Sequence, residues 1–152
     1  MKTSQITAAA IITIAIAGLI IYWVSPTLRY ANTFIKADEY VKKGDFENAA
    51  RLYADASSKD PDNIKYYIKL AEIYTKTKDM PKLKKTFEGG LKADGKNKYF
   101  LVNAGWMEFQ SKEYAKAEER FRKAAEEDPK NPKIHFMHAR ALQEQGKHKE
   151  AL

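Results

Sequence analysis

The feature that most constrains this chain is a repeat. Residues 44–63 read GDFENAARLYADASSKDPDN, and residues 112–131 read KEYAKAEERFRKAAEEDPKN, with rings, small residues and a proline at matching positions. A third copy, residues 78–97, reads KDMPKLKKTFEGGLKADGKN, so the period is 34 residues. Stacked structural units need such repetition, because each unit must present the same apolar face to its neighbour. A single active site would not require it.

Each period has room for two helices separated by a short turn. The turns are expected near Gly44, Lys78, Lys112 and Gly146. The apolar spacing predicts first helices over 30–43, 64–77, 98–111 and 132–145, and second helices over 46–58, 80–93, 114–127 and from 148 onward. No segment has the alternation of a strand. An asparagine stands before each of three first helices as an expected N-cap: Asn63, Asn97 and Asn131.

Packing accounts for the conserved spacing of residue types between copies. Small residues let the second helix approach its partner, rings fill the space one turn later, and prolines end the hairpin. The predicted core therefore contains Ala49, Tyr53, Phe87, Ala117 and Phe121. Glu108 stands where the pattern expects a ring, and neighbouring Phe109 is expected to compensate for it.

This pattern resembles the tetratricopeptide repeat, a helix-turn-helix of 34 residues with small and aromatic positions and a terminal proline. The resemblance covers residues 30–152. It implies an α-solenoid of three full repeats and a partial fourth, so that the whole chain is expected to be all-α, with a single N-terminal transmembrane helix, argued below, before the solenoid. The expected domains are a membrane anchor over 1–28 and a repeat domain over 29–152, with repeats at 30–63, 64–97, 98–131 and, incomplete, 132–152.

The resemblance also implies a concave groove, lined by the first helices, that holds a peptide or partner protein. Transferred by position, the groove residues are Phe34, Asp38, Ile68, Glu72, Tyr99, Asn103, Trp106, Phe109, Phe136 and Arg140. One branch of the family grips a C-terminal carboxylate with Lys, Asn and Arg residues. Of the matching positions here only Asn103 is suitable, joined by Lys133 when the frame moves by one repeat, so an apolar or amphipathic helical ligand is expected instead. Trp106 and Phe109 fit the core between repeats equally well.

An apolar segment precedes the repeats. No charged residue lies between Lys2 and Arg29, and the stretch from Ile6 to Val24 is long enough to cross a bilayer as a helix. A cleaved signal peptide is the alternative, but no small-residue cleavage motif ends the run. We therefore expect a single-pass protein of the inner cell membrane. The short lead with one lysine places the repeat domain on the non-cytoplasmic side, whereas Arg29 and the lysines after it favour the opposite orientation.

Composition argues against several other functions. The formal charge of +7 is spread over mixed faces, so no nucleic-acid partner is expected. The chain has no cysteine, which excludes disulfides and thiolate sites. His135 and His138 lack a third ligand at metal-binding spacing and are expected to pack. Without a phosphate loop or nucleophile motif, we expect no enzyme, no catalytic residues, no metal and no cofactor.

The functional hypothesis is a membrane-anchored adaptor that binds a partner protein or peptide in its groove. An open last repeat exposes core-like surface, so a second hypothesis is a homo-oligomer, a ring or filament built by head-to-tail stacking of copies. A third is an accessory subunit of a larger membrane complex.

Overall fold

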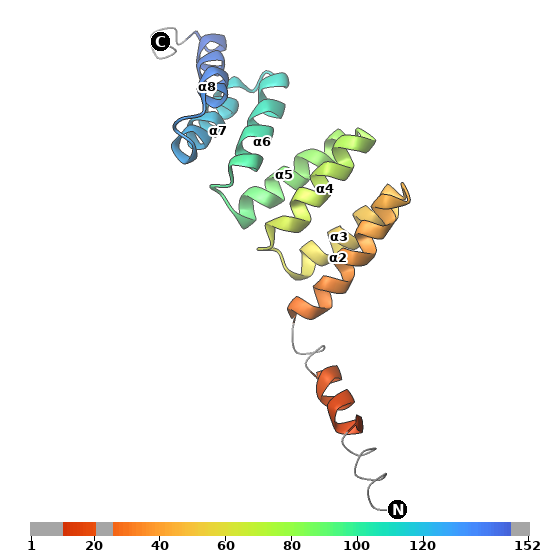
Figure 1. Ribbon diagram of the computed structural model, residues 1–152. Helices are drawn as coiled ribbons and strands as arrows, with labels where there is room; N and C mark the ends of the chain where they lie inside the picture. Colours follow the sequence, from red (N-terminus) through yellow and green to blue (C-terminus); the bar gives the residue numbers. More distant parts are fainter. Residues whose placement is uncertain (1–10, 21–25, 147–152) are drawn as a thin grey trace, which may run out of the picture. The chain divides into compact units, whose positions relative to one another are not determined.

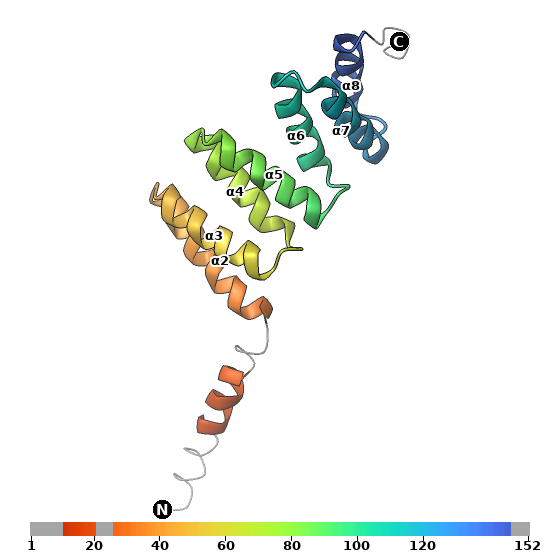
Figure 2. The same cartoon turned by 180° about the vertical axis from the view of Figure 1, so that it is seen from behind.

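The computed structural model describes residues 11–20 and 26–146 of the chain. Residues 11–20 are helical, and the helices that follow are α2 (Pro26–Lys42), α3 (Phe46–Lys59), α4 (Ile64–Thr77), α5 (Met80–Ala93), α6 (Lys98–Gln110), α7 (Tyr114–Glu127) and α8 (Pro132–Glu144) (Figures 1 and 2). No strand occurs in these two ranges. The predicted all-α succession of helical hairpins is confirmed there, while the helix expected from 148 onward lies outside the described residues.

The chain divides into two compact units, residues 1–52 and residues 53–152. The first contains α2 and the beginning of α3, where Ala37 and Ala49 are fully buried. Asp45 caps α3, because its Oδ1 accepts a hydrogen bond from the backbone N–H of Asn48 at 3.1 Å. Small buried residues at the predicted spacing thus occur in both helices of this unit.

In the second unit each helix packs against the next one along the chain, from α4 to α8. One apolar cluster holds Leu83, Phe87 and Phe100, with Ile68 and Tyr74 packed against it. Another centres on Phe121. The predicted core residues Ala49, Tyr53, Phe87, Ala117 and Phe121 are all buried, so this prediction is confirmed.

Two glycines permit the closest approach between helices. A Cβ atom on Gly90 of α5 would lie 2.5 Å from the ring of Phe100 in α6, which is fully buried. A Cβ atom on Gly105 of α6 would lie 2.9 Å from the ring of Phe121 in α7. Both glycines are therefore packing residues, because a side chain there would displace a core ring.

The turns inside the hairpins repeat a left-handed backbone conformation. Gly44 and Gly146 have φ values of +78° and +74°, and the corresponding Lys78 and Lys112 have φ values of +57° and +62°. Residues in this left-handed region end the first helix and reverse the chain direction. Glycine adopts the conformation freely, whereas a lysine does so at a cost.

Two of the three predicted asparagine caps are confirmed. The side-chain oxygens of Asn63 and Asn131 accept hydrogen bonds from the N–H groups of Lys65 and Lys133. The prediction for Asn97 is wrong, since its side chain makes no capping bond. Its amide donates to the Asp94 carboxylate at 3.2 Å.

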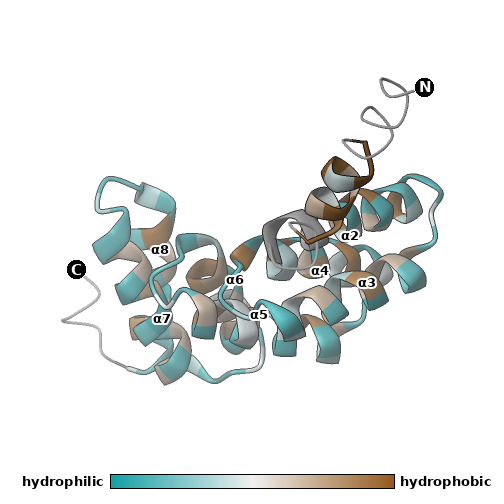
Figure 3. Cartoon of the chain, turned by 90° about the horizontal axis from the view of Figure 1, so that it is seen from below, coloured by the Kyte–Doolittle hydropathy of each residue, from teal (hydrophilic) through white to brown (hydrophobic). Residues whose placement is uncertain are grey.

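The segment 11–20 is apolar and exposed along its length, and it is coloured mostly brown in Figure 3. Within the described parts of the chain, no helix is both long enough and apolar enough to span a bilayer. The predicted span from Ile6 to Val24 lies partly outside the described residues, at 6–10 and 21–24.

Replacing Lys112 with glycine tests the strain in the turn. We expect Lys112→Gly to raise the free energy of unfolding by about 0.5–1 kcal/mol. The strain energy of a lysine in the left-handed conformation is larger than the entropy that the more flexible glycine loses on folding. Urea unfolding followed by circular dichroism measures the change. The control is Lys85→Gly on the exposed face of α5, which should lose about 1 kcal/mol. Equal losses in both variants would contradict the interpretation.

Candidate functional site

The main candidate site is a cleft between α6 and α8, the first helices of the third and fourth hairpins. Its volume is about 290 Å³. Tyr99 and Lys133 are exposed, whereas Ile134 and Met137 are buried. The cleft is therefore apolar at its base and polar at its rim. Its full lining is Lys98, Tyr99, Val102, Asn103, Asn131, Lys133, Ile134 and Met137.

The rim carries positive charge. No carboxylate belongs to the lining, which includes Lys98 and Lys133. The Nζ of Lys98 lies 2.6 Å from Oδ2 of Asp128, and this bond is the first cause that lowers the pKa of the Asp128 carboxyl below its usual range. Lys133 has no carboxylate within 4.0 Å among the described residues. Lys133 is therefore available to an anionic group of a ligand.

Next along these two helices lies a group that we call the Arg140 cluster: Trp106, Phe109, Phe136 and Arg140. The rings of Trp106 and Phe109 stack with their centroids 5.8 Å apart and an interplanar angle of 5°. The guanidinium carbon of Arg140 lies 5.0 Å from the centroid of Phe109 and 5.8 Å from that of Phe136. Trp106 is 40% exposed and Phe136 is 61% exposed, so the cluster presents aromatic surface to solvent.

Tyr99 joins the cleft to the core. Its ring lies edge-on to Phe100 at 5.3 Å and to Phe87 at 6.3 Å between centroids. Burial is the main cause that raises the pKa of the Tyr99 hydroxyl, and the charge of Glu72 adds to it. The hydroxyl is therefore protonated at neutral pH and can donate a hydrogen bond.

The structure brings part of the predicted groove together. Tyr99 and Asn103 line the cleft, and the other four residues of α6 and α8 form the Arg140 cluster. Phe109 also packs against the core around Phe121, so it serves the core and the cluster at once. The remaining predicted residues lie elsewhere: Ile68 packs on the α4–α6 core, Glu72 is 3.4 Å from Lys69, and Phe34 and Asp38 belong to α2 in the first unit.

The predicted set omitted several lining residues. Lys98 is the first residue of α6, and Asn131 was interpreted only as a cap. The sequence contains a signal for a structured loop at this place, because an aspartate stands three residues before each of the three asparagines, at Asp60, Asp94 and Asp128. Each carboxylate accepts a hydrogen bond from its asparagine amide at 3.0–3.2 Å. This repeated pair shapes the loop that carries the cleft rim.

A second hollow surrounds Glu108, between α5, α6 and α7. It has a volume of about 30 Å³. The Oε1 of Glu108 lies 3.5 Å from Nε of Arg120, whereas its Oε2 is buried without a hydrogen-bond partner. Burial raises the pKa of the Glu108 carboxyl, and the charge of Arg120 opposes the rise. Phe109, which was expected to compensate for the missing ring, packs against the core of α7 and α8 and does not line this hollow.

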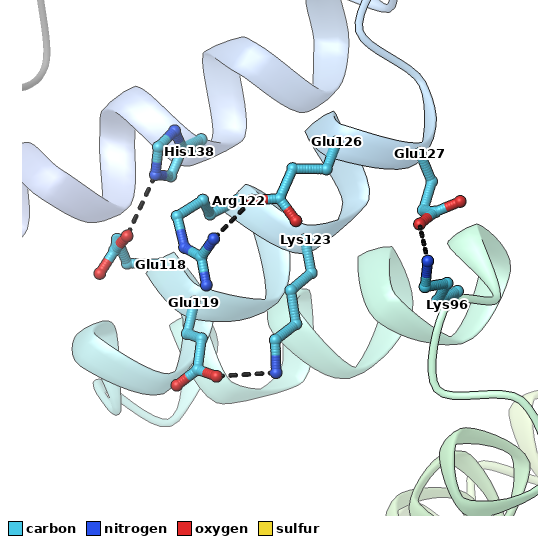
Figure 4. A network of polar contacts seen from close by, with 8 residues as sticks. All are labelled: Lys96, Glu118, Glu119, Arg122, Lys123, Glu126, Glu127 and His138. Atoms are coloured by element: carbon cyan, nitrogen blue, oxygen red, sulfur yellow. Dashed lines mark hydrogen bonds and ion pairs between the residues drawn. The ribbon is translucent and has the colours of Figure 1, made fainter.

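The two histidines of α8 contact different residues of the chain. The Nε2 of His138 lies 3.2 Å from Oε1 of Glu118 on α7, as Figure 4 shows, and that of His135 lies 2.9 Å from the carbonyl oxygen of Pro129. Figure 4 also shows ion pairs along α7, such as Lys123 with Glu119 at 2.8 Å. In the described ranges, no cluster of three or more His, Asp or Glu residues could hold a metal ion.

Comparison with known proteins adds independent information. A family model described as tetratricopeptide repeat matches residues 40–101 and 108–152. The Hsp70-Hsp90 organizing protein 1 of Glycine max is 30% identical over 99 residues, and organizing protein 2 of Arabidopsis thaliana is 29% identical over 99 residues. Each alignment covers 65% of this chain, which spans only 17% of the length of these curated relatives.

Solved structures share the fold. MamA superposes with a TM-score of 0.66 at 22% identity, covering 79% of this chain and 66% of its own. YrrB, a TPR protein with an unusual peptide-binding site, gives 0.65 at 19% identity, covering 78% and 61%. The first TPR of Spaghetti (RPAP3), bound to the HSP90 peptide SRMEEVD, gives 0.60 at 16% identity, covering 76% and 92%.

The partly buried Glu108, whose Oε2 is fully buried, leads to a pH-dependent prediction. Its raised pKa means that it stabilises the fold when protonated, and this contribution is lost as the pH rises through its folded pKa. Glu108→Gln cannot ionise, so we expect it to be more stable than the wild type at pH 7, by about 1 kcal/mol. The difference should shrink as the pH falls toward about 4.3. Urea unfolding at several pH values measures it.

The matched control for this prediction is Glu113, whose pKa is lowered mainly by its hydrogen bond from Lys116. Glu113→Gln should therefore change stability in the opposite direction at pH 7. A Glu108→Gln variant that is less stable than the wild type at pH 7 would show that the Arg120 ion pair outweighs burial.

Proposed function

The chain belongs to the tetratricopeptide repeat family, and from that premise we propose that it is a membrane-anchored adaptor which holds a segment of a partner protein in the cleft between α6 and α8. The observation that carries the proposal is the cleft itself. It combines a buried apolar base at Ile134 and Met137 with a polar rim that includes Lys133, and no carboxylate belongs to its lining. Binding sites for peptides need such apolar area together with a few polar groups that fix orientation.

The exposed rings strengthen this interpretation. Trp106 and Phe136 keep 40% and 61% of their surface in solvent, although buried neighbours on the same helices already supply the core. Aromatic side chains are enriched where proteins bind each other, because they bury large area with little loss of conformational freedom. Two proteins of similar fold, Spaghetti (RPAP3) with its bound HSP90 peptide and YrrB with its peptide-binding site, agree with a peptide ligand.

The membrane anchor is the second part of the proposal. All six large apolar side chains of the segment 11–20, which are Ile11, Ile12, Ile14, Ile16, Leu19 and Ile20, are between 50% and 72% exposed. A helix that is apolar on all sides is stable when surrounded by lipid or protein. The uncharged sequence continues on both sides of this segment, from Ile6 to Val24, which favours lipid. From the short lead with Lys2 we propose an inner-membrane protein whose repeats lie on the non-cytoplasmic side.

Crosslinking from the Arg140 cluster, next to the cleft, tests the adaptor function. A photoreactive amino acid replaces Trp106 in the full chain in intact membranes, and mass spectrometry identifies the adducts. We expect a covalent adduct with another polypeptide, reduced in yield by Lys133→Glu, because that change reverses the charge of the rim. The control position is Glu126, on the exposed face of α7.

Other crosslinking outcomes would contradict the adaptor. Adducts formed only with further copies of this chain would favour the ring or filament. Stoichiometric co-purification with several subunits would favour the accessory-subunit hypothesis. Equal adduct yields at positions 106 and 126 would remove the cleft from the binding surface.

Lysine substitutions test the anchor. We expect the wild-type chain to stay in the membrane fraction after an alkaline carbonate wash, and the double variant Ile14→Lys, Ala17→Lys to be released. Each lysine at the centre of a span costs about 2.5–3.5 kcal/mol of insertion free energy. The control is Ile35→Lys, which changes an exposed isoleucine of α2 outside the span. Release of the wild-type chain by the same wash would refute the anchor.

A further inference from the structure

The four arginines whose side chains the structure describes differ in their partners. Arg120 lies 3.5 Å from Glu108, Arg122 lies 2.5 Å from Glu126, and Arg51 donates a hydrogen bond to Asn48 at 3.1 Å. Arg140 contacts two aromatic rings instead. Among the residues that the structure describes, it has no carboxylate within 4.0 Å, including Glu144 one turn further along α8.

Contact with ring faces leaves the hydrogen-bonding capacity of a guanidinium unused. The five N–H donors of arginine lie in the plane of the group, whereas a cation–π contact uses the face. Phe109 and Phe136 restrict the motion of the Arg140 side chain, so less conformational entropy is lost when a ligand binds to it. A carboxylate is the group that fits two parallel donors of this kind.

No carboxylate lines the cleft next to Arg140, and Asp128, which lies beside the cleft, is paired with Lys98. Lys133 lies seven residues earlier on α8, on the same helix face, and Phe136 lies between them. Tyr99, Asn103 and Trp106 occupy the corresponding face of α6, and none is acidic. This charge distribution complements an acidic segment and disfavours a basic one.

We propose that Arg140 determines the specificity of the site formed by the cleft and the neighbouring Arg140 cluster: it binds a side-chain carboxylate of an acidic peptide segment, next to an aromatic or aliphatic side chain that packs on Trp106 and Phe136. The proposal rests on the peptide-binding function proposed above and names the chemistry of its ligand. On the protein, Phe136 and Arg140 are four residues apart on one helix, which places them about 5–6 Å apart at the Cβ atoms. A ligand matches that distance with an apolar and an acidic residue two apart in an extended chain, or four apart in a helix.

Selection from a phage-displayed library of random peptides tests the specificity. The bait is the full chain, purified in detergent. We expect the wild type to enrich peptides that pair an aromatic or aliphatic residue with Asp or Glu at these spacings. With Arg140→Gln as bait the enrichment of acidic residues should be lost while that of apolar residues persists. Arg140→Lys should give partial enrichment, because it keeps the charge and loses the planar donors.

Affinity measurements on the most enriched peptide complete the test. Arg140→Gln should weaken binding by about tenfold, and replacing the acidic residue of the peptide by its amide should cause little further loss in that variant. The matched control is Arg122→Gln, the same change on the exposed face of α7, which should bind like the wild type. Unchanged melting temperatures for these variants establish that the fold is intact.

The outcomes separate the two proposals. If the wild-type chain enriches no peptides, the peptide-binding function itself fails. If it enriches peptides and Arg140→Gln selects the same proportion of acidic residues, the function stands and the role of Arg140 is refuted.

Discussion

The contact between a core ring and a residue without a bulky side chain underlies the rest of this structure. Phe100 packs against Gly90, and Phe121 packs against Gly105, at distances that leave no room for a Cβ atom to be added. Each helix has too little apolar surface to fold alone, so stability requires that successive helices approach closely and share one core. The 34-residue period follows from this requirement, since every new hairpin must present a small residue and a ring at the same places.

The shared core explains why aromatic residues are left for another role. In α6 the core is formed by Phe100, Leu101, Ala104 and Gly105, which are buried. Tyr99 and Trp106 lie on the same helix and remain partly exposed. Exposing such rings gives up about 25 cal/mol of favourable free energy for each Å² left in water. One face of α6 therefore packs in the core, and the other presents apolar surface to a ligand. Packing in the core alone does not explain the exposed rings of Tyr99 and Trp106.

Helix order and core positions could be predicted from the sequence, because they depend on local spacing. The turn residues Lys78 and Lys112 mark the helix ends whichever way the hairpins pack. Contacts between helices depend on how each one is rotated, and spacing does not reveal this. Hence the direction in which Phe109 packs and the buried oxygen of Glu108 were missed. The bond between Asn97 and Asp94 is local, and the spacing that it shares with Asn63 and Asn131 could have revealed it. The role proposed for Arg140 could not be inferred from the sequence, because it depends on the ring of Phe109, which another helix places beside the guanidinium.

The proposed anchor changes the affinity that the cleft must supply. A tether to the same membrane as the partner raises the effective concentration of the two binding surfaces to the millimolar range for short connections. A cleft of about 290 Å³, together with the guanidinium and the exposed rings of the neighbouring Arg140 cluster, is then sufficient, although it is small for tight binding in solution. Because the tether increases encounters without distinguishing partners, discrimination must come from the groove. The charge of Arg140 and Lys133, opposed by no carboxylate of the cleft lining, can supply it.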